Sequence, residues 1–86
     1  YAARSNRLAK ELAPDHPVKV PYNRRRGTID KHLQRGKITP QQAVFAKQYI
    51  ENLLDRAMMN NDYFLNGYKE DIEMNAVYAA VGIILN

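Results

Sequence analysis

The chain has 86 residues, no cysteine and a formal net charge of +4 at pH 7. This length corresponds to one domain, and the content of 45% apolar and 26% charged residues is typical of a globular chain. Without cysteine, a disulfide framework, a thiolate zinc site and a thiol nucleophile are excluded. The two histidines are isolated and form no metal-binding motif. We therefore expect neither a metal ion nor any other cofactor.

Positive charge is concentrated in the first part of the chain. Residues 1–37 hold ten Lys or Arg and three acids, a balance of +7, whereas residues 38–86 hold three bases and six acids, a balance of −3. We expect a single domain over residues 1–86 with a basic N-terminal half and an acidic, apolar helical half. A dense cationic segment attracts polyanions, and guanidinium groups bind phosphate in a bidentate manner. The candidate nucleic-acid-binding residues are Lys19, Tyr22, Arg24, Arg25, Arg26, Lys31, Arg35 and Lys37.

The first predicted element is a short helix over residues 2–13, which Pro14 ends. Residues 14–27 follow, and Pro14, Pro17 and Pro21 favour extended geometry there. The sequence therefore predicts a proline-rich basic loop between the first and second helices. This loop ends in the arginine triplet, as an extended arm that could grip a phosphate backbone, with Tyr22 packed against sugar or base.

A second short helix is predicted over residues 28–35, with Thr28 as its cap. Lys31 and Arg35 are four residues apart, so they project from the same side of this helix. Gly36 suits the left-handed position that commonly ends a helix.

The strongest local pattern is Thr39-Pro40-Gln41-Gln42. It combines a capping hydroxyl, a proline at the first helical position and a glutamine at the third, which is the capping-box pattern. We expect a core-facing helix from Pro40 to about Asn60, because its apolar residues form two adjacent rows. The rows are Phe45, Tyr49, Leu53 and Ala57, and Ala46, Ile50, Leu54 and Met58.

Lys69 to Leu85 is predicted to form the last helix, with acidic residues near its start that complement the helix dipole. The stretch from Met74 to Leu85 is almost entirely apolar, but its twelve residues fall short of the ~20 that span a bilayer. Such a helix is expected to be central in the fold or to form an interface between chains. The candidate interface residues are Val77, Ala80, Val81 and Ile84.

A helix-turn-helix motif fits poorly, because a turn glycine at Gly36 puts His32 where a small apolar residue belongs. The segment Thr39-Pro40-x-Gln42-x-x-Phe45-x-x-x-Tyr49-Ile50 resembles the opening of the DNA-binding region in phage terminase small subunits. The segment Asn75-Ala76-x-x-Ala79-Ala80 resembles a later piece of that region. The two pieces lie close together in that family and about 25 residues apart here, so the sequence assigns no family.

These observations predict an all-α protein, a small bundle of about four helices. No motif for a nucleophile, a partnered base or a phosphate-binding glycine loop occurs, so we expect no enzyme. The predicted function is binding of nucleic acid, DNA rather than RNA. The alternative is a non-catalytic interaction module, a regulator, inhibitor or assembly subunit, that docks its basic surface on an acidic partner protein. Homo-oligomer formation is compatible with either. We expect no membrane partner and an intracellular, cytoplasmic location, because Arg4, Arg7 and Lys10 interrupt every apolar run near the start.

Overall fold

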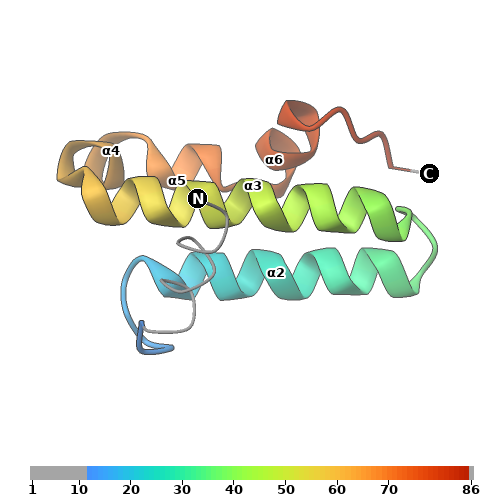
Figure 1. Cartoon of the computed structure of the whole chain (residues 1–86), viewed down its shortest axis with the longest axis horizontal. Coiled ribbons are helices and arrows are strands. Elements are labelled where there is room, and N and C mark those ends of the chain that lie inside the picture. The colour runs from blue at the N-terminus through green and yellow to red at the C-terminus, as the bar shows by residue number, and fades with distance from the viewer. Residues whose placement is uncertain (1–11, 86) are drawn as a thin grey trace.

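The computed structural model describes residues 12–85, and that part of the chain contains five α-helices and no strand (Figure 1). This confirms the predicted all-α helical bundle. The helix predicted over residues 2–13 lies outside the described residues except for Leu12 and Ala13, which are not helical. The helices are α2 (Lys19–Gln34), α3 (Pro40–Met59), α4 (Asn61–Asn66), α5 (Tyr68–Asp71) and α6 (Met74–Ala80).

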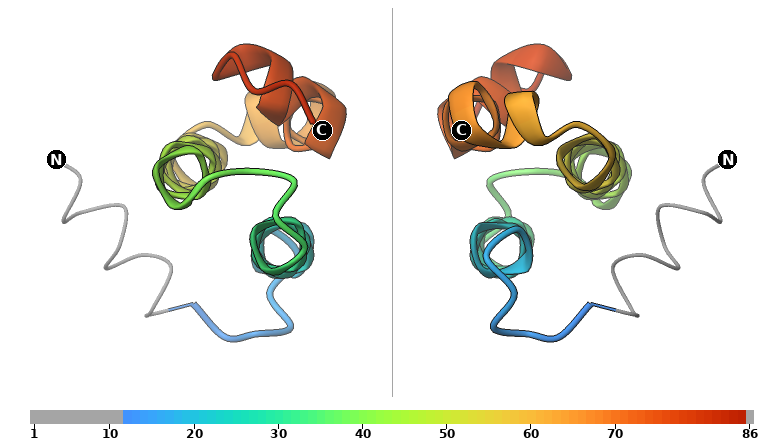
Figure 2. Two further views of the ribbon diagram at one scale, coloured as in Figure 1. Left: turned by 90° about the vertical axis from the view of Figure 1, so that its right-hand side faces the viewer. Right: turned by 90° about the vertical axis from the view of Figure 1, so that its left-hand side faces the viewer.

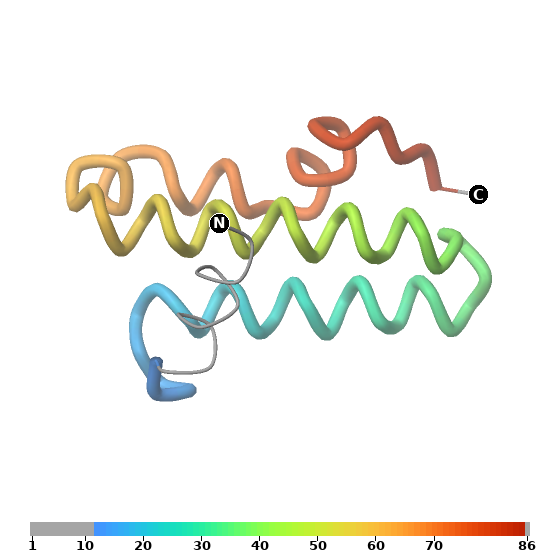
Figure 3. Tube along the Cα trace, viewed as in Figure 1, coloured from blue at the N-terminus to red at the C-terminus, as the bar shows by residue number. Residues whose placement is uncertain are grey.

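The helices pack in a three-cornered arrangement. Helices α2 and α3 lie side by side and antiparallel, joined by the short turn at one end of the molecule (Figure 1). After α3 the chain reverses, and α4, α5 and α6 run back along α3 in succession (Figure 3). Viewed end-on, α2, α3 and this C-terminal segment occupy the corners of a triangle (Figure 2). The core therefore lies between the helical hairpin and the three short helices.

Helix α2 is longer than the sequence predicted, and the predicted loop is correspondingly wrong. The helix begins at Lys19 and contains Pro21 in its first turn, where a missing backbone N–H removes no intrahelical hydrogen bond. Thr28 is not a cap but lies within α2, and its hydroxyl donates a hydrogen bond to the Arg24 carbonyl at 3.1 Å. The arginine triplet is therefore part of a regular helix rather than of an extended arm.

The end of α2 is built as the sequence predicted. Gly36 has φ of +72°, the left-handed conformation that a side chain disfavours. The backbone N–H of Gly36 donates to the Leu33 carbonyl at 3.1 Å, and that of Lys37 donates to the His32 carbonyl at 3.0 Å. This pair of bonds is the Schellman motif, and it reverses the chain toward α3.

Helix α3 confirms the capping-box prediction. The Thr39 hydroxyl accepts from the Gln42 backbone N–H at 3.1 Å, and the Gln42 side chain accepts from the Thr39 N–H at 2.9 Å. The helix runs from Pro40 to Met59, one residue short of the expected end. One face of α3 is buried, including Ile50 and Leu54. Phe45 and Met58, which were expected in the buried rows, are 47% and 38% exposed.

The single helix predicted from Lys69 to Leu85 is instead two short helices. Helix α5 ends at Asp71, and α6 begins at Met74 after Ile72 and Glu73. Helix α6 ends at Ala80 and is followed, after Val81, by a second left-handed glycine, Gly82, also with φ of +72°. The residues that follow Gly82 are not helical, and Ile84 there is 86% exposed.

The core is closed by aliphatic residues from every long element and by two fully buried tyrosines. Tyr68 is 0% exposed, and its hydroxyl donates to the Val18 carbonyl at 2.7 Å, which ties α5 to the start of α2. The fully buried aliphatic side chains are Ile29, Ile50, Leu54, Ile72 and Val77.

None of the helices between residues 12 and 85 combines the length and the apolar character that crossing a bilayer requires.

Candidate nucleic-acid interface

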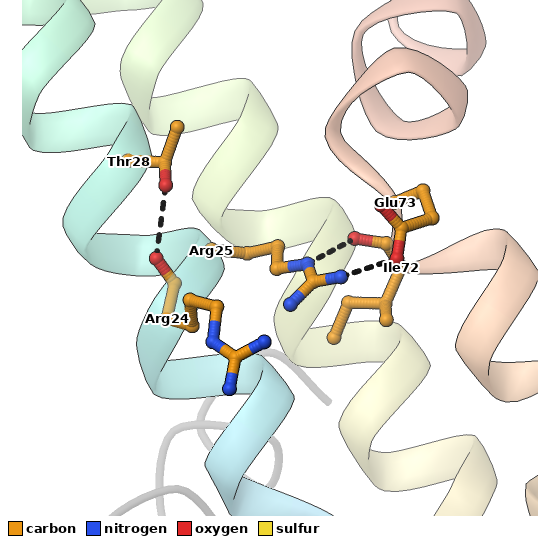
Figure 4. A network of polar contacts seen from close by, with 5 residues as sticks. All are labelled: Arg24, Arg25, Thr28, Ile72 and Glu73. Carbon is orange, nitrogen blue, oxygen red and sulfur yellow. Dashed lines mark hydrogen bonds and ion pairs between the residues drawn. The ribbon is translucent and has the colours of Figure 1, made fainter.

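Arg25, the middle residue of the triplet, bonds to the C-terminal part of the chain. Its side chain is only 11% exposed. Its Nε donates to the Ile72 carbonyl at 3.1 Å, and its Nη2 forms an ion pair with the Glu73 carboxylate (Figure 4). Arg25 thus connects α2 to the junction between α5 and α6.

Arg26, whose side chain is 45% exposed, also contacts groups of the protein itself. Arg26 Nη1 donates to the Tyr22 hydroxyl at 2.8 Å and lies 3.5 Å from Glu51 Oε1 on α3. Partial burial lowers the pKa of Arg26, but the hydrogen bond to Tyr22 and the Glu51 charge raise it above its usual value. Tyr22 itself is 1% exposed. The expectation that Tyr22 packs against sugar or base is therefore wrong, because its ring belongs to the core.

Two further lysines are tethered to the protein's own oxygen atoms. Lys19 Nζ donates to the Leu12 carbonyl at 2.9 Å. Lys47 on α3 forms an ion pair with Asp30 at 2.6 Å, and Asp30 is the single acid within α2. Lys37 lies half-buried in the turn after α2.

The remaining candidates form one line along the exposed side of α2. Arg24, Lys31 and Arg35 are all exposed, and within residues 12–85 none of the three makes an ion pair. At 3.6 residues per turn, Lys31 and Arg35 lie within about 20° of Arg24 around the helix axis and extend over about 16 Å. The buried residues Tyr22 and Ile29 lie on the opposite side of α2. We call Arg24, Lys31 and Arg35 the basic stripe.

A groove adjoins the basic stripe where α2 faces the α5–α6 junction. It comprises two hollows of about 260 Å³ and 440 Å³ that share Arg24, Arg25 and Glu73 as lining residues. Figure 4 shows the Arg24 and Arg25 side chains extending from α2 on the side where Glu73 lies. We call this the junction groove. Its other lining residues are Val20, Pro21, Thr28, Lys69, Ile72, Met74 and Asn75.

Residues 1–83 match a family described as "Family of unknown function (DUF6076)". The chain belongs to this family. No curated protein and no solved structure matches it. The assignment to DUF6076 thus leaves the function to be argued from the site itself.

The predicted interface residues of this DUF6076 chain do not form one exposed surface. Val77 is 0% exposed and packs in the core, so it is not available to a partner chain and that prediction is wrong. Val81 is half-buried, whereas Ala80 and Ile84 are exposed. The interface role of Ala80, Val81 and Ile84 stays a prediction.

Sequence reasoning missed Lys69, Glu73 and Asn75 as neighbours of the basic residues. They lie more than forty positions after Arg24, and only the return of the chain along α3 brings them to α2. No local pattern signals this proximity. Within residues 12–85, no group of three or more His, Asp or Glu side chains could hold a metal ion.

Proposed function

We propose that this member of the DUF6076 family is a non-catalytic nucleic-acid-binding protein that lays the outer side of α2 on a phosphate backbone. The observation that supports the proposal is the division of the cations of α2. Arg25 and Arg26 are held by Glu73 and Glu51, whereas the basic stripe is exposed on a side of the helix that carries no carboxylate. Cations on such a line would be neutralised by a regularly spaced polyanion, and release of counterions would drive the binding.

Duplex DNA is the form of nucleic acid that we expect as the ligand. An α-helix fits the major groove of B-form DNA, which is about 12 Å wide, whereas the major groove of A-form RNA is too narrow for side chains to read. Helix α2 is exposed along the basic stripe over about three turns. It can therefore lie in or across such a groove with its cations near both phosphate strands.

The test is the affinity for a fluorescein-labelled DNA duplex, measured by anisotropy between about 50 mM and about 200 mM salt. In the variant Arg24→Gln/Lys31→Gln/Arg35→Gln, three phosphate contacts are lost. The slope of log affinity against log salt should then become shallower by about 2.7, at 0.9 per contact. Because all three side chains are exposed, the variant should keep its helix content.

A charge-matched control separates the basic stripe from net charge. Gln41→Glu, Gln48→Glu and Asn61→Asp also lower the net charge from +4 to +1, but they lie on exposed positions of α3 and α4. This control should retain most of the salt slope. If the salt slope became equally shallow in both variants, only the overall charge would attract DNA, and the proposal would be wrong.

An interaction module remains the second candidate, supported by apolar side chains on α3. Val44 is 51% exposed and Phe45 is 47% exposed, next to the uncharged Gln41 and Gln48. In this function the basic stripe would meet an acidic protein surface. A synthetic poly-glutamate peptide that binds more tightly than the DNA duplex at the same salt concentration would favour this alternative.

A further inference from the structure

The junction groove contains an acid that competes for its arginines. The groove gathers Arg24, Arg25 and Lys69 as cations, and Glu73 is the one carboxylate among its lining residues. The Glu73 carboxylate pairs with Arg25, as a phosphate oxygen would (Figure 4), and it lines the same hollow as Arg24. Of the ion-paired acids near α2, Glu73 is the most solvent-exposed, at 61% for its side chain, compared with 12% for Glu51 and 48% for Asp30.

The two partners of the Arg25–Glu73 pair differ in how firmly they are held. Arg25 keeps a second bond, from its Nε to the Ile72 carbonyl, so its guanidinium stays in place when the carboxylate leaves. The Glu73 side chain makes no capping hydrogen bond to α6, although the residue is the cap of that helix. Glu73 can therefore rotate into solvent without disturbing either helix end.

We propose that the junction groove is a phosphate subsite and that Glu73 acts as an internal competitor, occupying Arg25 until a nucleic-acid phosphate displaces it. This inference rests on the proposed function, since it places a further phosphate site, which Glu73 controls, at one end of the same binding surface. Arg24 belongs both to the basic stripe and to the groove, so a backbone following the stripe would place a phosphate at its entrance. Asn75 lines the same hollow and offers a side-chain amide that can donate to a phosphate oxygen, whereas the Thr28 hydroxyl there already donates to the Arg24 carbonyl.

The test compares two neutralising variants that change the net charge equally. Glu73→Gln removes the competitor, whereas Glu70→Gln removes an exposed acid of α5 that does not line the groove. Removing a partly exposed competing pair should tighten binding of the DNA duplex about three- to fivefold. Glu70→Gln should change the affinity by less than about twofold, through long-range attraction alone.

A spectroscopic measurement reports on Arg25 directly. The Nε–H signal of Arg25 in a ¹⁵N-correlated spectrum can be assigned by its loss in Arg25→Lys. On addition of the duplex to the wild-type chain, the Nε–H signals of Arg25 and Arg24 should shift together. In Glu73→Gln the same shifts should occur at a lower duplex concentration. A shift of the Arg24 signal with no change at Arg25 would overturn the inference.

The outcomes separate this inference from the proposed function. If Glu73→Gln behaves as Glu70→Gln while the triple variant of the basic stripe loses binding, the competitor role is wrong and the proposed function stands. If neither the wild-type chain nor Glu73→Gln binds the duplex at about 50 mM salt, both are wrong. If Glu73→Gln increases the affinity for poly-glutamate as much as the affinity for DNA, and poly-glutamate binds the variant more tightly than DNA does, the groove binds an acidic protein instead.

Discussion

The buried hydrogen bond of Tyr68 gives a prediction whose size changes with pH. Tyr68→Phe keeps the ring but removes the donor to the Val18 carbonyl, in a part of the core where both residues are nearly inaccessible. Leaving a buried acceptor without this partner costs about 1–3 kcal/mol. For a domain of this size, about 1 kcal/mol corresponds to about 4–8 °C in the melting temperature. A urea titration at neutral pH should therefore give a lower midpoint for the variant with an unchanged slope.

The effect of Tyr68→Phe on the free energy of unfolding should change at alkaline pH, because of the pKa of the Tyr68 hydroxyl. Burial, with a smaller contribution from Tyr63, raises the pKa of the Tyr68 hydroxyl well above its usual value near 10. Above about pH 10 the unfolded chain loses the Tyr68 proton while the folded chain retains it, so the free energy of unfolding falls as pH rises. Tyr68→Phe lacks this group. At about pH 11 the difference in free energy of unfolding between the wild-type chain and Tyr68→Phe should therefore be about 1.4 kcal/mol smaller than at neutral pH.

Tyr49→Phe is the matched control, because Tyr49 is only half-buried and no hydrogen bond of its hydroxyl to residues 12–85 is found. It should change the free energy of unfolding by less than about 0.5 kcal/mol. A Tyr68→Phe deficit that stays constant from about pH 8 to about pH 11 would refute the reasoning, since both states would then release the proton together.

Three further predictions concern stability. Thr39→Ala removes the capping box of α3 and should lower the free energy of unfolding by about 1 kcal/mol in thermal melts followed by circular dichroism, while Thr39→Ser should retain most of it. Val77→Asp places a carboxylate in the core and should unfold the chain or cost more than about 3 kcal/mol. Ile84→Asp, at a position 86% exposed, should stay within about 0.5 kcal/mol of the wild-type chain, and a large loss there would contradict the exposed placement of the C-terminal segment.

Helices whose signals are local were predicted well, and those whose ends depend on context were not. The start of α3 is specified locally, because Thr39 and Gln42 exchange two hydrogen bonds and Pro40 occupies the first helical position. The start of α2 was missed because Pro21 was interpreted as a break, although a proline fits the first turn equally well. Thr28 was ambiguous for a similar reason, since a threonine hydroxyl can cap a helix or bond to the carbonyl four residues earlier.

The basic character of the candidate site was evident from composition, but the division of its cations was not. Arg25 is neutralised by Glu73, which lies 48 positions away, and such pairing depends on the tertiary fold alone. The alignment of Arg24, Lys31 and Arg35 is different. It follows from helical periodicity once α2 is known to be continuous through Thr28, so an error in one helix boundary concealed the stripe.

The short turn between α2 and α3 has a consequence for how the chain folds. Five residues separate the two longest helices, so the entropy lost in closing this loop is small and the two helices can pair progressively outward from the turn. Helices α4, α5 and α6 have six, four and seven residues, too few to persist in isolation. We therefore expect the hairpin to form first and to act as the template on which the last third of the chain becomes ordered.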